Sequence, residues 1–145
     1  MNLKNKKLFI FDLDGTLVDT APDFKNSLNY MLSELNEPLV TLDEIRNLVG
    51  YGARELIRRT VVTKNISHDD DKINEMLKIF LLHYTHNIDD DSVLFENVET
   101  VLKLIKSKKL KLAVCTNKME KLSNMLLEKL GVSVSYTHLR AHETV

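Results

Sequence analysis

The sequence predicts an α/β fold in which a parallel sheet carries a helical insertion after its first strand. Two observations lead to this prediction. Compact apolar runs at residues 7–11 and 110–115 have the length and composition of strands that are buried on both faces of a parallel sheet. The chain between and after these runs places apolar residues at helical spacing, so strands alternate with helices.

Four helices are predicted between residues 20 and 89. The first begins at Thr20, and a proline stands in its first turn. A capping box at residues 41–44 opens the second helix, which Gly50 is predicted to end. The third helix follows this glycine, and residues 67–70 supply the N-terminal cap of the fourth.

An acidic run at residues 89–91 is the predicted boundary of this helical subdomain. A helix beginning near Val98 leads into the second strand, and a last helix at residues 118–130 is predicted to stop at Gly131. The predicted division is a core at 1–19 and 90–133, a helical subdomain at 20–89, and a tail at 134–145.

Composition narrows the classes of function. The 145 residues are 43% apolar and 28% charged, with a net charge of −1, so nucleic acid and anionic membranes are not expected as partners. The apolar run before Asp12 is too short for a signal peptide, and no segment is long enough to span a bilayer. Cys115 is the only cysteine, which excludes an internal disulfide and favours a cytoplasmic location.

The strongest chemical signal is Asp12-Leu13-Asp14-Gly15-Thr16, directly after the first strand. A carboxylate at the carboxyl end of a parallel strand lies where α/β folds bind ligands, and Asp12 can attack phosphorus to form an aspartyl-phosphate. Asp14 can protonate the leaving alcohol and then deprotonate the hydrolytic water. Oxygen ligands of this kind suit Mg²⁺. Two other interpretations of this motif are a turn in which Asp and Thr only cap backbone groups and a calcium-binding loop. The apolar run before Asp12 disfavours the calcium-binding loop.

Residues 11–20, Phe-Asp-Leu-Asp-Gly-Thr-Leu-Val-Asp-Thr, resemble the first motif of the haloacid dehalogenase (HAD) superfamily, and within it the phosphoglycolate phosphatase-like branch. The resemblance implies a Rossmann-like core with an α-helical cap. It implies that Asp12 is the nucleophile and a magnesium ligand, and that Asp14 is the general acid/base and contributes its backbone carbonyl to the metal. Residues 114–118 resemble the second motif, in which Thr116 and the backbone N–H of Asn117 bind the phosphoryl group.

The resemblance extends to the cap. Gly50-Tyr51-Gly52 resembles its substrate-facing loop, and Arg58 or Arg59 could meet a substrate carboxylate, although surface or cap–core salt bridges are the preferred interpretation of both. Lys118 ranks below Thr116, because a solvated lysine in the first turn of a helix is an equal alternative. His83 and His86 are interpreted as polar surface residues of the cap.

Three features depart from the family pattern. Residues 95–97, Phe-Glu-Asn, stand where an aromatic residue, Pro and Gly are usual, and the family's third and fourth motifs, a lysine and an acidic pair, are not found. Residues 134–145 lack helical or strand periodicity and resemble a translated transposase sequencing adapter, so His138 and His142 are not interpreted as a metal site.

The predicted function is a magnesium-dependent phosphomonoester hydrolase acting on a small phosphorylated metabolite, with 2-phosphoglycolate as a candidate. The alternatives are a sugar phosphomutase resembling β-phosphoglucomutase, or an inactive fragment that expresses poorly and leaves the edge of the second strand or its neighbour unpaired. A dehalogenase is disfavoured, because a halide leaves without the proton that Asp14 would supply. No oligomeric state is predicted.

Overall fold

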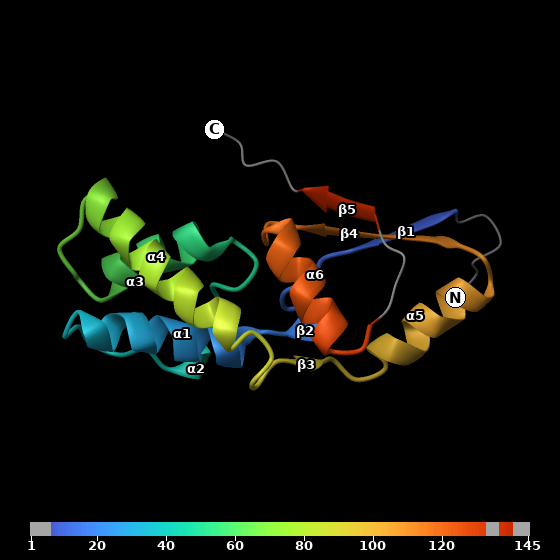
Figure 1. The fold of residues 1–145 in the computed structure, drawn as a ribbon, viewed down its shortest axis with the longest axis horizontal. Helices are drawn as coiled ribbons and strands as arrows, with labels where there is room; N and C mark the ends of the chain where they lie inside the picture. Colours follow the sequence, from blue (N-terminus) through green and yellow to red (C-terminus); the bar gives the residue numbers. More distant parts are fainter. Residues whose placement is uncertain (1–6, 133–136, 141–145) are drawn as a thin grey trace.

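The structure, a computed structural model, describes residues 7–132 and the backbone of residues 137–140. Strands and helices follow one another largely as the sequence predicts (Figure 1). In chain order the elements are β1 (Leu8–Phe11), β2 (Val18–Asp19), α1 (Ala21–Glu34), α2 (Leu42–Arg46), α3 (Ala53–Thr63), α4 (Asp70–His86), β3 (Val93–Leu94), α5 (Val98–Ser107), β4 (Lys111–Thr116), α6 (Glu120–Lys129) and β5 (Thr137–Arg140).

Three parallel strands form the main sheet in the order β1-β4-β5. The register pairs Phe11 with Val114, so the chain leaves β1 and β4 at the same edge of the sheet. The middle strand, β4, buries Ala113 and Val114 almost completely. The predicted α/β class and parallel sheet are confirmed.

The prediction that the first strand is buried on both faces is wrong. Leu8 and Ile10 are 46% and 55% exposed, whereas Phe9 and Phe11, which point to the other face, are half-buried against the core. Within the described residues β1 pairs only with β4 and stands at the edge of the sheet. Nothing in that part of the chain therefore shields the face of β1 that carries Leu8 and Ile10.

Part of the tail forms a strand, although its sequence lacks strand periodicity. The backbone of residues 137–140 forms β5 beside residues 113–116 of β4, because backbone groups at a sheet edge can pair whatever the side-chain pattern of the incoming segment. The strand β4 thus has neighbours on both sides, and the free edge within the described residues belongs to β1. Residues 134–136 and 141–145 lie outside the described residues, so the adapter interpretation stays a prediction.

The helices α1 to α4 lie between β2 and β3 in the chain and gather at one end of the molecule, away from the sheet (Figure 1). The predicted capping box is confirmed: the N–H of Thr41 donates to Glu44 Oε2 at 2.7 Å, and the N–H of Glu44 donates to Thr41 Oγ1 at 3.4 Å. However, α2 ends at Arg46 rather than near Gly50, because the chain enters a turn in which Leu48 N–H bonds to the Ile45 carbonyl.

A two-stranded antiparallel ribbon of β2 and β3 joins this helical group to the sheet, and the sequence did not predict it. Beside it, the buried Asp23 accepts hydrogen bonds from Asp91 N–H at 3.0 Å and from the N–H and hydroxyl of Ser92 at 2.8 and 2.6 Å. These bonds tie the start of the helical group to its end. No helix in the described part of the chain is long and apolar enough to cross a membrane.

The last helix, α6, begins at Glu120, two residues later than predicted. Its predicted first residue, Lys118, instead turns its side chain into the interior. The predicted stop is confirmed: Gly131 has a φ of +70° and donates its N–H to the carbonyl of Glu128.

Candidate active site

The predicted nucleophile, Asp12, stands at the carboxyl end of β1. Its Oδ1 accepts a 2.7 Å hydrogen bond from the N–H of Leu13. The chain then turns back on itself, with the N–H groups of Leu17 and Val18 both bonded to the carbonyl of Leu13. Gly15 has a φ of +79°, which confirms that this turn uses a conformation that favours glycine.

Thr116 ends the neighbouring strand, β4, and is 2% exposed. The parallel register brings it beside Asp12, where its hydroxyl favours the ionised carboxylate, and its Oγ1 accepts the N–H of Lys118 at 3.2 Å. Two predicted residues that lie 104 positions apart in the sequence are therefore neighbours at one edge of the sheet.

The surroundings of Asp12 affect its charge in opposite ways. Partial burial raises the pKa of its carboxyl, and the negative charge of Asp14 raises it further. The Leu13 N–H, the Thr116 hydroxyl and the Lys118 ammonium favour the ionised form, but the pKa stays above its ordinary value of 3.8. A cation bound beside Asp12 would favour the carboxylate that a nucleophile requires.

Lys118 is buried, so the interpretation of a solvated lysine is wrong. Its Nζ lies 3.0 Å from Asp14 Oδ1 and 2.7 Å from the Tyr84 hydroxyl oxygen. The ammonium also lies 4.5 and 4.6 Å from the ring centres of Phe24 and Tyr84. Burial lowers the pKa of Lys118, and Asp14 opposes that shift.

Tyr84 is a site residue that sequence reasoning missed. It lies on α4, is 1% exposed, and packs against Phe24 and Phe80 with ring centres 4.9 and 5.8 Å away. Its spacing of four residues from Phe80 is that of an ordinary apolar stripe. Nothing in the sequence pattern distinguishes it from packing residues, whereas the position of Lys118 two residues after Thr116 was a usable signal.

The predicted substrate-facing loop of the helical group contacts the ends of both strands. Gly50 has a φ of +97°, and a side chain there would place a Cβ 3.9 Å from Asp12 Oδ2. Asn117 donates its side-chain amide to the Gly50 carbonyl at 2.8 Å, and a Cβ on Gly52 would lie 3.7 Å from the Asn117 carbonyl. The loop thus lies beside the predicted nucleophile, which stays exposed to solvent.

The third loop residue, Tyr51, is 52% exposed and carries the guanidinium of Arg59 at 3.9 Å from its ring centre. Arg58 and Arg59 both form ion pairs with Glu55, at 3.0 and 2.7 Å. Intrahelical salt bridges therefore engage both arginines, which agrees with the surface interpretation given to them above.

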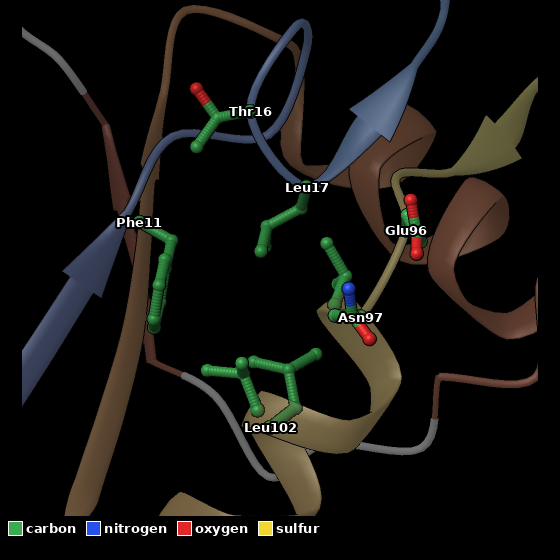
Figure 2. Close-up of a pocket in the computed structure, with 8 residues that line it drawn as sticks. Phe11, Thr16, Leu17, Glu96, Asn97 and Leu102 are labelled. Carbon is green, nitrogen blue, oxygen red and sulfur yellow. The ribbon is translucent and has the colours of Figure 1, made fainter.

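A cavity near this edge is separate from Asp12. It has a volume of about 160 Å³ and lies between the end of β1 and the start of α5. Figure 2 shows the side chains of Phe11, Leu17 and Leu102 around one apolar space. Asn97, on its rim, has a φ of +66°, a conformation that asparagine tolerates better than most residues, which explains how it replaces the family's usual glycine.

Two described residues carry oxygen donors that could hold a metal ion. Asp12 offers a carboxylate and Asp14 a backbone carbonyl, which are oxygen donors of the kind that Mg²⁺ prefers. Within residues 7–132 no group of three or more His, Cys, Asp or Glu side chains could hold a metal ion. His83 instead hydrogen-bonds the Ser27 hydroxyl at 3.0 Å, and His86 the Leu82 carbonyl at 2.8 Å.

Curated relatives and solved structures are similar to this chain over most of its length. It is 36% identical over 137 residues to a phosphoglycolate phosphatase of Agrobacterium fabrum, covering 94% of this chain and 59% of that protein. It is 39% identical over 129 residues to one of Caulobacter vibrioides, covering 89% and 54%. A solved structure described as a predicted phosphoglycolate phosphatase from Haemophilus somnus 129PT superposes with a TM-score of 0.88 at 28% identity, covering 99% of this chain and 66% of that one.

The chain thus spans somewhat more than half the length of the curated relatives it matches. The family model for haloacid dehalogenase-like hydrolases matches residues 9–145, which include both β1 and β4 with the polar residues that follow them. The chain therefore belongs to the haloacid dehalogenase-like hydrolase family.

Proposed function

We propose that this chain carries the nucleophile side of a magnesium-dependent phosphomonoester hydrolase that works through an aspartyl-phosphate. One observation supports this most strongly: Asp12, Asp14 and Thr116 converge at the carboxyl ends of two adjacent parallel strands, under a loop of the helical group. This edge is where α/β folds bind ligands.

The proposed reaction has two steps. One carboxylate oxygen of Asp12 attacks phosphorus, the bond to the ester oxygen breaks, and Asp14 donates a proton to the departing alcohol. Asp14 then takes a proton from a water that attacks the aspartyl-phosphate, which releases phosphate and restores the Asp12 carboxylate. Oδ2 is the attacking oxygen in this scheme, since Oδ1 accepts the Leu13 N–H and Oδ2 faces Gly50. The Thr116 hydroxyl and the Asn117 backbone N–H would bind the phosphoryl oxygens.

A Mg²⁺ ion held by the Asp12 carboxylate and the Asp14 carbonyl would neutralise the repulsion between this carboxylate and the phosphate dianion. These two donors are fewer than a Mg²⁺ ion takes up, so other groups would have to hold the metal together with them. We therefore propose that the 145-residue chain by itself does not turn over phosphate esters. Magnesium-dependent hydrolysis of p-nitrophenyl phosphate by the pure 145-residue chain, abolished by Asp12→Asn, would overturn that proposal.

The helical group is the proposed cap, and Gly50, Tyr51 and Gly52 its substrate-facing loop, because this loop lies against Asp12 and Asn117. A cap loop beside the nucleophile favours a small phosphorylated metabolite as the substrate. The names of the curated relatives make 2-phosphoglycolate the first substrate to test. The cytoplasm remains the expected location.

The deciding experiment assays the complete reading frame that contains these residues, with Mg²⁺, on 2-phosphoglycolate and β-glucose 1-phosphate. A hydrolase releases inorganic phosphate, whereas a mutase returns the phosphoryl group to the sugar and yields glucose 6-phosphate. Asp12→Asn should abolish either activity, and Asp71→Asn, at an exposed aspartate of α4, is the matched control. If the complete protein turns over no phosphate ester, the proposed function is wrong.

A further inference from the structure

Lys118 is a charged side chain with almost no access to solvent. Its side chain is 4% exposed, and that of its partner Asp14 is 6% exposed. A buried ammonium is strongly disfavoured unless it is paired and hydrogen-bonded. The arrangement therefore constrains both groups, since neither can leave the other without exposing an unpaired charge to an apolar interior.

Lys118 and its two side-chain partners come from three separate parts of the chain. Asp14 belongs to the turn after β1, Tyr84 to α4 of the helical group, and Lys118 itself to the segment after β4. The backbone N–H of Lys118 also donates to Thr116 Oγ1. One residue thus holds the predicted acid/base, the predicted phosphoryl-binding hydroxyl and a helix of the proposed cap.

We propose that Lys118 is a positioning residue that fixes the Asp14 carboxylate for proton transfer, and that Tyr84 ties this pair to the helical group. The inference rests on the proposed role of Asp14 as general acid/base. Lys118 holds Oδ1, so Oδ2 is the oxygen that exchanges a proton with the leaving group. Proton transfer requires a donor within hydrogen-bond reach of the ester oxygen, and a carboxylate free to rotate would meet that geometry only part of the time.

The contact with Tyr84 makes this positioning depend on where α4 lies. Burial and the nearby charges of Asp14 and Asp23 raise the pKa of the Tyr84 hydroxyl well above its ordinary value, so it stays protonated and neutral. Its oxygen accepts a hydrogen bond from the ammonium, and its ring and that of Phe24 face the same cation. Phe24 belongs to α1, so if α4 alone moved away, Lys118 would lose Tyr84 while remaining beside Asp14 and Phe24.

Leaving-group dependence separates positioning from a merely structural role. An alkyl alcohol needs a proton to depart, whereas p-nitrophenolate does not, so only the alkyl ester depends on Asp14 in the first step. In the complete reading frame, we expect Lys118→Met to lower kcat/KM by ~100-fold for 2-phosphoglycolate and by less than ~10-fold for p-nitrophenyl phosphate. Asp14→Asn should show the same selectivity more strongly.

Three further variants keep this test decisive. Tyr84→Phe keeps the ring and removes the hydroxyl, and should show the same selectivity in weaker form. Lys118→Gln keeps a hydrogen-bond donor and replaces Lys118→Met if that protein does not fold. Lys121→Met changes an exposed lysine of α6 and should leave both esters unaffected.

Equal losses on the two esters in the folded variants would overturn the positioning role while the proposed function stands. Absence of turnover by the wild-type protein on every ester would instead remove the proposed function, and this inference with it.

Discussion

The two sides of β1 differ in what they bury. Toward the helical group, the turn after the strand buries an ion pair, Asp14 with Lys118, at 6% and 4% side-chain exposure. On the outer side of the same strand, Leu8 and Ile10 are 46% and 55% exposed. Charged groups are thus inside and large apolar groups outside, the reverse of the usual distribution.

The difference shows what decides burial at each place. Asp14 and Lys118 can be buried because each pairs with the other and the Tyr84 hydroxyl oxygen accepts a second hydrogen bond from the ammonium. Leu8 and Ile10 are exposed because no element of the described residues covers the face of β1 that carries them. Side-chain chemistry alone predicts neither outcome; the neighbouring elements decide both.

The largest expected effect lies at the nucleophile. In the complete reading frame, Asp12→Asn should lower kcat by ~10⁴-fold or more, because the covalent route is lost while the rest of the site is kept. Steady-state phosphate release measures this. Turnover within tenfold of wild type would show that Asp12 is not the nucleophile. The residues that converge after β1 would then have no proposed catalytic role.

The second-largest effect is expected at the buried ion pair, where the burial of Asp14 and of Lys118 should each depend on the other. Lys118→Met should lower the free energy of unfolding by ~3–5 kcal/mol, because it leaves the Asp14 carboxylate buried and unpaired. Combining it with Asp14→Asn should restore part of this loss, since the buried charge is then removed. Urea denaturation of the complete reading frame measures the cycle.

Lys129→Met is the matched control for this cycle. Lys129 forms an ion pair with Asp89 in which its side chain is 44% exposed, so the loss should stay below ~1 kcal/mol. A cost for Lys118→Met no larger than that of the control would contradict the mutual dependence of Asp14 and Lys118.

A smaller effect is expected on the outer side of β1. In the 145-residue chain, Ile10→Thr should change the free energy of unfolding by no more than ~0.5 kcal/mol, because Ile10 is already in contact with solvent. It should also reduce self-association, measured by size-exclusion chromatography, since an exposed apolar edge promotes pairing between chains. Leu112→Thr on β4, where Leu112 is 9% exposed, is the destabilising control. If Ile10→Thr and Leu112→Thr lowered the free energy of unfolding equally, the outer face of β1 would not be exposed as described.

The smallest expected effect is a pH dependence at Asp23. Burial raises the pKa of this carboxyl in the folded state, while hydrogen bonds from Ser92 and Asp91 oppose the shift. The folded state therefore holds the proton to a higher pH than the unfolded state. The contribution of Asp23 to stability should fall as pH rises from 3.8 through the folded pKa.

Asp23→Asn removes this titration, so urea denaturation of both proteins across this range gives the contribution of Asp23 by difference. If the stability of the wild type relative to Asp23→Asn rose with pH over this range, the predicted sign would be wrong.

Sequence reasoning succeeded where the signal is local. The capping box at Thr41 and the stop at Gly131 each depend on a few adjacent residues, and both were confirmed. It failed where pairing is distant. The two-residue strands β2 and β3 are too short to show a periodicity, and their pairing joins residues about 75 positions apart.

For the candidate site, the sequence by itself determined which groups follow the two strands: Asp12 and Asp14 after β1, and Thr116 at the end of β4. The parallel register then places them together. Only the tertiary structure decided that Lys118 is buried against Asp14, that Tyr84 of α4 joins them, and that β1 stands at the edge of the sheet. The physical reason is that burial depends on which distant elements arrive as neighbours, and periodicity within one element does not encode that.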